Sequence, residues 1–205
     1  MRTNSVPSFE ITGGILAGGR GVRLGGVDKA WLEVAGVPLI ERVLTALRAQ
    51  MDQVLINANR EPERYARFDR PVVADALADF AGPLAGISAV LDAARTDWVL
   101  CVPVDAARLP PDLAQRMCAA LRQNGARAAF ACNADGTVPV CCLLSRALRD
   151  DLRAALAAGE RSVRHWLAGQ AACEVDFSEW PTAYWSLNTP DDLKRVEARL
   201  RSDAA

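Results

Sequence analysis

Several features that would narrow the function are missing from this chain of 205 residues. It has a single histidine, His165, so a histidine cluster for metal binding or triad chemistry cannot form within one chain. No apolar run approaches the roughly 20 residues that a membrane-spanning helix needs. The formal net charge is −1 and the pI is near 5.9, which argues against partners that need a strongly basic face, such as nucleic acid or anionic membranes. An anionic ligand must therefore be held by a local cluster of positive charge.

The six cysteines do not form a pattern that indicates disulfides or zinc. No two of them are spaced as CxxC, and a zinc site needs such clustering. We therefore expect reduced thiols that are buried as small hydrophobic side chains. Cys118 lies in a segment of helical period, and the other five lie in apolar, strand-like segments: Cys101, Cys132, Cys141, Cys142 and Cys173.

The first ten residues, MRTNSVPSFE, lack the apolar core that is typical of a secretory leader. We expect residues 1–10 to be flexible and the protein to be cytoplasmic. The remaining residues, 11–205, are enough to bury a core of their own, so we expect them to form a single domain.

Short apolar runs alternate with segments of helical period along the first part of the chain. Nearly continuous apolar strands that alternate with helices predict an α/β fold, with a parallel sheet covered by helices on both faces. The predicted strands are 11–18, 52–59, 71–75 and 97–105, and the predicted helices are 37–51, 61–68, 81–95 and 109–125, the last closed by Gly125.

The second part of the chain changes this pattern. Residues 126–145 look like two strands around Asp135-Gly136, a good dipeptide for a hairpin turn. Because a hairpin needs no crossover helix, we expect an antiparallel addition to a mostly parallel sheet. The order of the strands does not follow from the sequence. The other predicted elements are helices in 146–159, 161–169 and 189–202, with Thr189 as the N-cap of the last, and short strands at 173–178 and 183–188.

The stretch ILAGGRGVRLGGVDKAWL, residues 15–32, places five glycines among cations directly after the first predicted strand. Glycines let backbone N–H groups come close to a ligand, and clustered N–H groups form a concave anion site. Arg20, Arg23 and Lys29 add charged donors that suit phosphate oxygens. The segment has neither the GxxxxGK[ST] motif of P-loop proteins nor the GxGxxG motif of dinucleotide-binding proteins. It predicts a cradle for a triphosphate or pyrophosphate, the alternative being a flexible turn with solvated charges.

The same stretch resembles the LAGGxxxRMGGxDK signature of the molybdenum cofactor guanylyltransferases, which it matches at 16–19, at Arg23 and at 25–29. Further matches follow in the expected order, so the resemblance covers residues 11–200: INANR (56–60), VVADALADFAGPLAGI (72–87), LCVPVDAARLPPDL (100–113) and LNTPDDL (187–193). The resemblance implies a Rossmann-like, three-layer αβα nucleotidyltransferase fold. Residues 11–105 would form its nucleotide-binding half, and residues 106–205 the half for the pterin substrate.

The resemblance also implies an activity. Such an enzyme uses Mg²⁺ to transfer GMP from GTP to the terminal phosphate of Mo-molybdopterin, releasing pyrophosphate and forming the guanine dinucleotide cofactor. The substrate phosphate is the nucleophile, so the protein must supply in-line positioning and charge neutralisation. Transient contacts with other cofactor-assembly proteins and with apo-molybdoenzymes are implied as well, and none with nucleic acid or a membrane.

Carried over position by position, the resemblance assigns the phosphates to the glycine loop. Arg23 and Lys29 would neutralise them as catalytic residues, with Lys29 at the α-phosphate; the alternative for Lys29 is a surface lysine before a helix. The backbone of four loop residues would lie against the nucleotide: Leu16, Ala17, Gly18 and Gly19.

Two aspartates at predicted strand ends complete the implied site. Asp105 would be catalytic as the magnesium ligand, since Mg²⁺ takes oxygen ligands and usually keeps waters with one or two carboxylates; the alternative is a cap for the next helix. Asp75 would face the nucleotide, the alternative being an Asx-turn. Asn57 would contact the nucleoside, while Gly82 and Pro83 would wall the base.

Some positions depart from the family pattern. Leu24 replaces a methionine of similar volume, which should be tolerated. Ala106-Ala107 stand where a small polar residue and a proline are common, which predicts a looser loop. Ser186 replaces an asparagine, which puts part of the metal or pterin contact in question. Asn188 would reach the pterin substrate or the metal, with helix capping as an equal alternative.

The remaining candidates are open. Arg161 and Arg164 are hypothetical contacts for the acceptor phosphate, and His165 is expected to be a packing or surface residue. The tryptophans Trp166, Trp180 and Trp185 would lie in the core or stack on the pterin. Two other functions stay possible: a cytidylyltransferase of the same fold acting on molybdopterin or another phosphate, and a protein that binds nucleotide or cofactor without turnover. LAGG and GGVDK favour the guanine enzyme.

Overall fold

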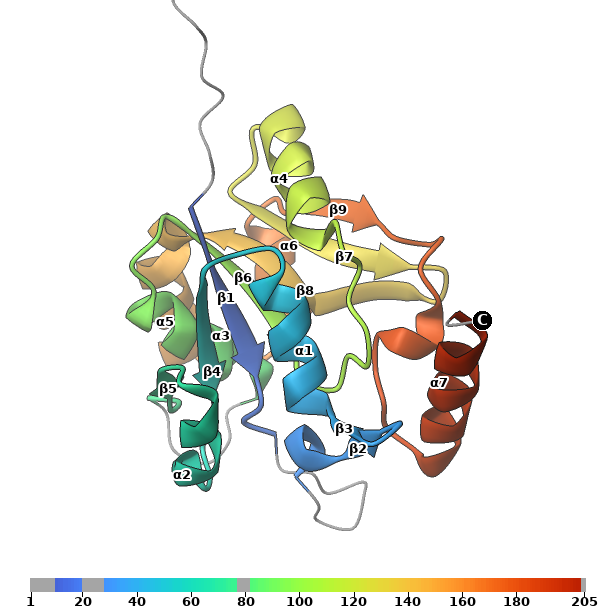
Figure 1. Cartoon of the computed structure of the whole chain (residues 1–205). Helices are drawn as coiled ribbons and strands as arrows, with labels where there is room; N and C mark the ends of the chain where they lie inside the picture. Colours follow the sequence, from blue (N-terminus) through green and yellow to red (C-terminus); the bar gives the residue numbers. More distant parts are fainter. Residues whose placement is uncertain (1–9, 20–27, 77–81, 204–205) are drawn as a thin grey trace, which may run out of the picture.

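The computed structural model describes residues 10–19, 28–76 and 82–203, and these residues contain one mixed sheet of seven strands (Figure 1). The strand order is β5-β4-β1-β6-β8-β7-β9. Every strand of this sheet runs parallel to its neighbours except β8, which is antiparallel to both β6 and β7. The predicted mostly parallel sheet with an antiparallel addition is therefore confirmed. The strands are β1 (Ile11–Leu16), β4 (Gln53–Asn57), β5 (Val72–Val73), β6 (Trp98–Pro103), β7 (Ala128–Asn133), β8 (Gly136–Ser145) and β9 (Cys173–Asp176).

Helices cover both faces of the sheet, as the three-layer prediction requires. On one face, α1 (Leu39–Arg48) and α4 (Leu113–Asn124) bury side chains such as Leu47 and Met117 against the strands. On the other face, α3 (Pro83–Ala93), α5 (Arg149–Ala157) and α6 (Val163–Gly169) form a second cluster. Each buried side chain of this size contributes about 1.5–3 kcal/mol, so the two apolar layers hold the sheet in place. None of the helices in the described ranges has both the length and the apolar composition that crossing a membrane requires.

Most predicted elements are present with shifted ends. The helix predicted at 37–51 begins only at Leu39, because Val37–Pro38 (β3) pairs with Glu33–Val34 (β2) in a small antiparallel hairpin. Helix α4 ends at Asn124 and is capped by Gly125, whose φ of +60° is the left-handed conformation expected there. The chain turns back between Asn133 and Gly136, so the predicted hairpin is confirmed. The segment predicted as helix 61–68 is α2 (Pro62–Tyr65) followed by the 3₁₀ turn η3 (Ala66–Phe68).

The segment 183–188, predicted as a strand, is not one. It contains the end of the 3₁₀ turn η5 (Thr182–Tyr184), and its buried side chains Tyr184, Trp185 and Leu187 do not alternate as those of a half-buried strand would. Tyr184 and Leu187 instead join a third, small cluster with Val196 of α7 (Pro190–Asp203). This cluster attaches α7 beside the β2–β3 hairpin.

The cysteines are all free thiols, as expected. Four of them are buried, and burial raises the pKa of the Cys118 and Cys141 thiols. The Cys118 and Cys141 thiols are therefore neutral, hydrophobic parts of the core.

Strand β8 carries an irregularity that opens the sheet near one end. After Phe130 in β7, the partner residue in β8 jumps from Cys142 to Val138. Pro139 lies within the jump and has no N–H to give to a ladder. The ladder between β6 and β8 ends at Cys101 opposite Cys142, two residues before β6 itself ends. The carboxyl end of β6 thus extends beyond its pairing with β8.

Candidate active site

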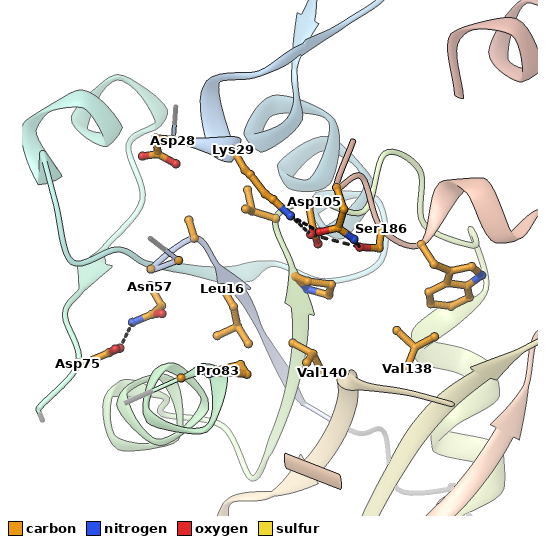
Figure 2. Close-up of a pocket in the computed structure, with 18 residues that line it drawn as sticks. Leu16, Asp28, Lys29, Asn57, Asp75, Pro83, Asp105, Val138, Val140 and Ser186 are labelled. Atoms are coloured by element: carbon orange, nitrogen blue, oxygen red, sulfur yellow. Dashed lines mark hydrogen bonds and ion pairs between the residues drawn. The ribbon is translucent and has the colours of Figure 1, made fainter. Parts of the chain in front are cut away.

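A cavity of about 530 Å³ opens at the carboxyl ends of β1, β4 and β6 (Figure 2). Leu16, Asn57 and Pro103 end these parallel strands, so the residues after them emerge at one edge of the sheet, where open α/β sheets bind ligands. Arg20, Arg23 and Leu24 of the glycine loop lie outside the described residues. The described residues that were predicted to bind the nucleotide or the metal all line the cavity: Leu16, Ala17, Gly18, Gly19, Lys29, Asn57, Asp75, Gly82, Pro83 and Asp105.

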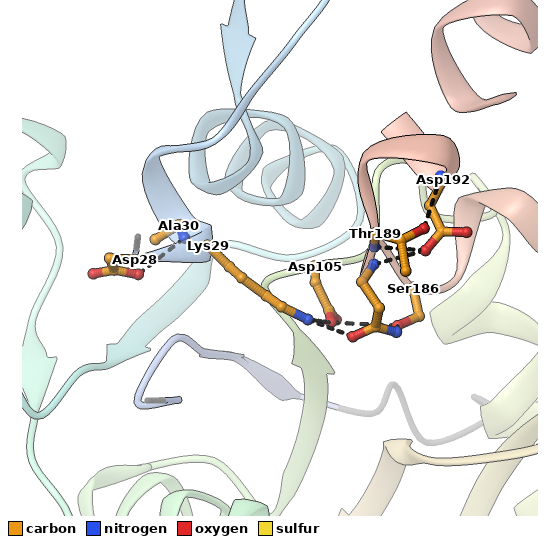
Figure 3. A network of polar contacts seen from close by, with 8 residues as sticks. Asp28, Lys29, Ala30, Asp105, Ser186, Thr189 and Asp192 are labelled. Atoms are coloured by element: carbon orange, nitrogen blue, oxygen red, sulfur yellow. Dashed lines mark hydrogen bonds and ion pairs between the residues drawn. The ribbon is translucent and has the colours of Figure 1, made fainter. Parts of the chain in front are cut away.

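A cation and several oxygens meet on the cavity wall. The Nζ atom of Lys29 donates to Asp105 Oδ2 at 2.8 Å and to Asn188 Oδ1 at 2.6 Å (Figure 3). The Ser186 hydroxyl donates to the same oxygen of Asp105 at 3.3 Å and accepts a bond from Asn188 Nδ2 at 2.6 Å. The Lys29 and Asp105 side chains are only 20% and 17% exposed, so their charges are partly shielded from water. The serine in place of the family's asparagine thus joins the network.

These oxygen atoms are of the kind that Mg²⁺ binds. Asp105 supplies a carboxylate, Asn188 an amide oxygen and Ser186 a hydroxyl. The Asp105 and Asn188 oxygens already bind a positive charge, the ammonium of Lys29. Among the described residues, no three His, Cys, Asp or Glu side chains gather into a metal centre made by protein alone. The donor set fits an ion that shares its coordination with waters and substrate phosphates, as Mg²⁺ commonly does.

A short, braced turn presents Lys29 to the cavity. Asp28 Oδ1 accepts the N–H of Ala30 at 3.0 Å and so caps the 3₁₀ turn η2 (Lys29–Trp31). The other oxygen of Asp28 accepts the Tyr65 hydroxyl at 3.2 Å. Tyr65 is fully buried, which raises its pKa and keeps the hydroxyl protonated as a donor. Its ring also packs on Trp31, with centroids 5.1 Å apart.

The turn before α7 holds Asn188 in place. Thr189 Oγ1 accepts the N–H of Asp192, and Asp192 Oδ2 accepts the N–H groups of Asn188 and Thr189 at 3.0 and 2.8 Å. Burial by itself raises the pKa of Asp192, but these hydrogen bonds and one from Arg195 together lower it to about 2. The side-chain capping is done by Thr189, as predicted, and by Asp192. The Asn188 side chain instead forms hydrogen bonds with Lys29 and Ser186 at the cavity.

At the other end of the cavity, Asp75 belongs to a second polar network. Buried Asn57 donates to one carboxylate oxygen of Asp75 at 2.8 Å, and Asn59 donates to the other at 2.8 Å while accepting the Asp75 N–H. Asp75 therefore holds both asparagine side chains in place at the cavity wall. Two glycines permit this close packing, since a Cβ at Gly18 would lie 2.7 Å from Asn59 Nδ2, and one at Gly86 2.4 Å from Asn57 Oδ1.

Helix α3 starts at the cavity wall. Its N-cap, Gly82, has φ +83° and ψ −177°, a conformation that only glycine adopts readily. Pro83 follows in the first turn, as predicted, where its missing N–H costs no helical hydrogen bond. This pair brings backbone rather than bulky side chains to the wall.

Of two expectations about the second half of the chain, the one about the loop at 106–107 is wrong, and the one about Arg161 and Arg164 gains no support. The loop with Ala106-Ala107 is not loose, because both alanines are buried and Ala107 N–H donates to the Tyr184 carbonyl at 2.9 Å. Arg161 and Arg164 are not among the described residues that line the cavity. The Arg161 guanidinium instead donates to the carbonyls of Leu156 and Glu160.

Val138 and Val140 of β8, which line the apolar side of the cavity, were not predicted. Trp185 lies beside them and is part of the core, one of the two places expected for it. The available signal was Pro139, since a proline inside an apparent strand marks an edge or a bulge. Trp166 is a core residue, and His165 is on the surface beside Glu160, as expected.

Comparisons with known proteins agree with this geometry. Residues 13–174 match the family model described as the MobA-like NTP transferase domain. A molybdenum cofactor guanylyltransferase of Shewanella amazonensis is 40% identical over 193 residues, which cover 94% of this chain and 98% of that protein. One from Burkholderia ambifaria is 44% identical over 202 residues, with coverage of 94% and 98%.

Solved structures share the fold. Molybdopterin-guanine dinucleotide biosynthesis protein A from Archaeoglobus fulgidus superposes with a TM-score of 0.77 at 22% identity, covering 93% of this chain and 99% of that one. The 2-C-methyl-D-erythritol 4-phosphate cytidylyltransferase of Thermus thermophilus gives a TM-score of 0.69 at 20% identity, with coverage of 92% and 98%. The nucleotidyltransferase fold predicted from the sequence is thus confirmed.

Proposed function

The chain belongs to the MobA-like NTP transferases and is a molybdenum cofactor guanylyltransferase, and from this premise we propose how its cavity carries out the transfer. An oxygen of the terminal phosphate of Mo-molybdopterin forms a bond to the α-phosphorus of GTP. The bond from that phosphorus to the bridging oxygen of the β-phosphate breaks, and pyrophosphate leaves. The observation that carries the proposal is that every described residue predicted for the nucleotide and the metal lines one cavity.

We assign the triphosphate to the loop of Leu16, Ala17, Gly18 and Gly19. Open space surrounds the position of a Cβ at Gly19, so a ligand can approach the backbone there. Lys29 has a flexible four-carbon stem, and on GTP binding its ammonium exchanges Asp105 for the α-phosphate, where charge develops. Arg23, outside the described residues, remains the predicted second cation.

The nucleoside takes the end of the cavity with Asn57. The hydrogen bond to Asp75 fixes the amide of Asn57, so this side chain is ready to meet the nucleoside without further ordering. Gly82 and Pro83 line the base site with main-chain groups, which can form hydrogen bonds with the donors and the acceptor of guanine.

We place Mg²⁺ at Asp105, with Ser186 and Asn188 beside it. The bound ion would neutralise charge on the transferred phosphate and on the departing pyrophosphate. Asp105, just beyond the end of β6, would hold the ion, while Asn188 orients Lys29 through their 2.6 Å hydrogen bond. Contacts with other cofactor-assembly proteins and apo-molybdoenzymes, and a cytoplasmic location, remain predictions from the sequence.

Pyrophosphate release with Mo-molybdopterin and either GTP or CTP tests the proposal. We expect kcat/KM for GTP to exceed that for CTP by at least about 100-fold, because a site with unpaired polar groups rejects the wrong base strongly. Equal use of CTP would favour a cytidylyltransferase, and no turnover at all would favour a binding protein. Asp105→Asn should abolish Mg²⁺-dependent turnover, whereas Asp52→Asn, an exposed aspartate before β4, should not.

A further inference from the structure

The two ends of the cavity differ in chemistry. Asn57 and Asp75 give one end side-chain amide and carboxylate groups, and the opposite end is lined by Val138 and Val140 (Figure 2). The Lys29–Asp105 pair lies between the two ends in this view. The lining of the cavity therefore suits two chemically different groups, one on either side of the charged pair.

Strand β8 supplies the valines of the apolar end. The register jump leaves Pro139 and Val140 without a partner in β7, while Val138 still pairs with Ala131. Val138 and Val140 line the cavity on either side of the proline. Both valines are half-buried, Val138 packed on one core cluster and Val140 on the other. Trp185 completes the wall and is itself fixed by an edge-on contact with Phe177. The two valines are therefore supported from behind and partly exposed to the cavity, whereas Trp185 is almost fully buried and borders the cavity beside them.

We infer that this wall, made of Val138, Val140 and Trp185, binds the flat pterin ring system of the acceptor and determines acceptor specificity. The inference rests on the proposed function. Both substrates must bring a phosphate to the Lys29–Asp105 pair at the same time, so their remaining parts must leave it in different directions. If the nucleoside occupies the polar end, the acceptor takes the apolar one.

The chemistry of the wall suits such a ring. A pterin has two apolar faces and a polar edge, and aliphatic and aromatic side chains bind a flat face through dispersion and removal of water. Ser186 and Asn188 border the wall with a hydroxyl and an amide, which are the groups that a heterocyclic edge or a phosphate can meet. Ligand sites commonly combine a largely apolar lining with a few such polar groups.

A double variant, Val138→Thr with Val140→Thr, tests the inference because it adds polarity at nearly unchanged shape. We expect the KM for Mo-molybdopterin to rise about tenfold or more, while the dissociation constant of GTP with Mg²⁺, measured by calorimetry, stays within about twofold. Val140→Asp should have the same effect more strongly. Val37→Thr is the matched control, since Val37 is exposed in β3 outside this cavity, and it should change neither quantity.

Weaker GTP binding with an unchanged acceptor KM would overturn the inference by assigning the wall to the nucleoside. Unchanged values for both substrates in the folded double variant would overturn it as well. If Val140→Asp lowers the melting temperature, the shape-preserving variant decides. Failure of the proposed function has a different signature, namely no guanine dinucleotide from the wild type, and direct titration with Mo-molybdopterin would then still compare the wall variants.

Discussion

Replacing Lys29 by methionine should tighten the binding of a divalent ion in the absence of nucleotide. Without GTP, the ammonium of Lys29 lies 2.8 Å from the Asp105 oxygen and 2.6 Å from the Asn188 oxygen that we assign to the metal site. An ion that enters there must displace this ammonium or remain close to it. The ion and GTP should therefore bind together in the wild type, because the phosphates draw Lys29 away from Asp105.

The expected size follows from the charges. Two unit charges 4 Å apart interact with about 4 kcal/mol at an effective dielectric constant of 20, so a divalent ion would be repelled by about 8 kcal/mol. Movement of the lysine and penetration of water reduce this value strongly. Even one fifth of it, about 1.6 kcal/mol, corresponds to more than a tenfold change in the dissociation constant.

Electron paramagnetic resonance of free Mn²⁺ measures this binding without turnover. Lys29→Met should bind Mn²⁺ at least about tenfold more tightly than the wild type, and Lys29→Arg, which keeps the charge, should not. Adding Asp105→Asn should remove the gained affinity. The same Lys29→Met variant should lose about two decades or more of kcat, as expected for a contact that strengthens in the transition state. Equal Mn²⁺ affinities for Lys29→Met and wild type would refute this reasoning.

Three further predictions concern the residues that support the site. Gly86→Ala should weaken GTP binding about tenfold in calorimetry, because its Cβ would lie 2.4 Å from the Oδ1 of buried Asn57, whereas Gly169→Ala, with nothing within 4 Å, should not. Tyr65→Phe should lower kcat about three- to tenfold with little change in the KM for GTP, since one hydrogen bond that braces the lysine turn is lost, and an unchanged kcat would contradict this role. The folded pKa of Asp192, about 2 against an ordinary 3.8, is lowered, so its stabilisation is present above about pH 4 and is lost as the pH falls toward 2. The unfolding free energies of wild type and Asp192→Asn should thus differ by about 2 kcal/mol at pH 6 and by much less at pH 2.5, and an equal difference at both would disprove the linkage.

The parts of the site that the sequence predicts are those that short segments determine. Leu16–Gly19, Asn57 and Asp105 each follow or end an apolar run, and parallel strands bring their carboxyl ends to one edge whatever the order of the strands. The contacts between segments do not follow from such local patterns. Lys29 and Asn188 are 159 positions apart, and only the packing of α7 on the β2–β3 hairpin brings them within hydrogen-bonding distance.

The apolar wall shows a different limit, because a local signal was present and still could not be interpreted. Pro139 stands inside 136–145 and excludes a regular central strand there, so a break in the ladder was predictable from its missing N–H. What that break exposes depends on which strand lies next to β8. Only the order β6-β8-β7 puts the break beside the carboxyl end of β6, and hence beside Asp105. Strand order results from long-range packing of whole helices and strands, so the valines on either side of Pro139 could be assigned to the cavity only once the fold was known.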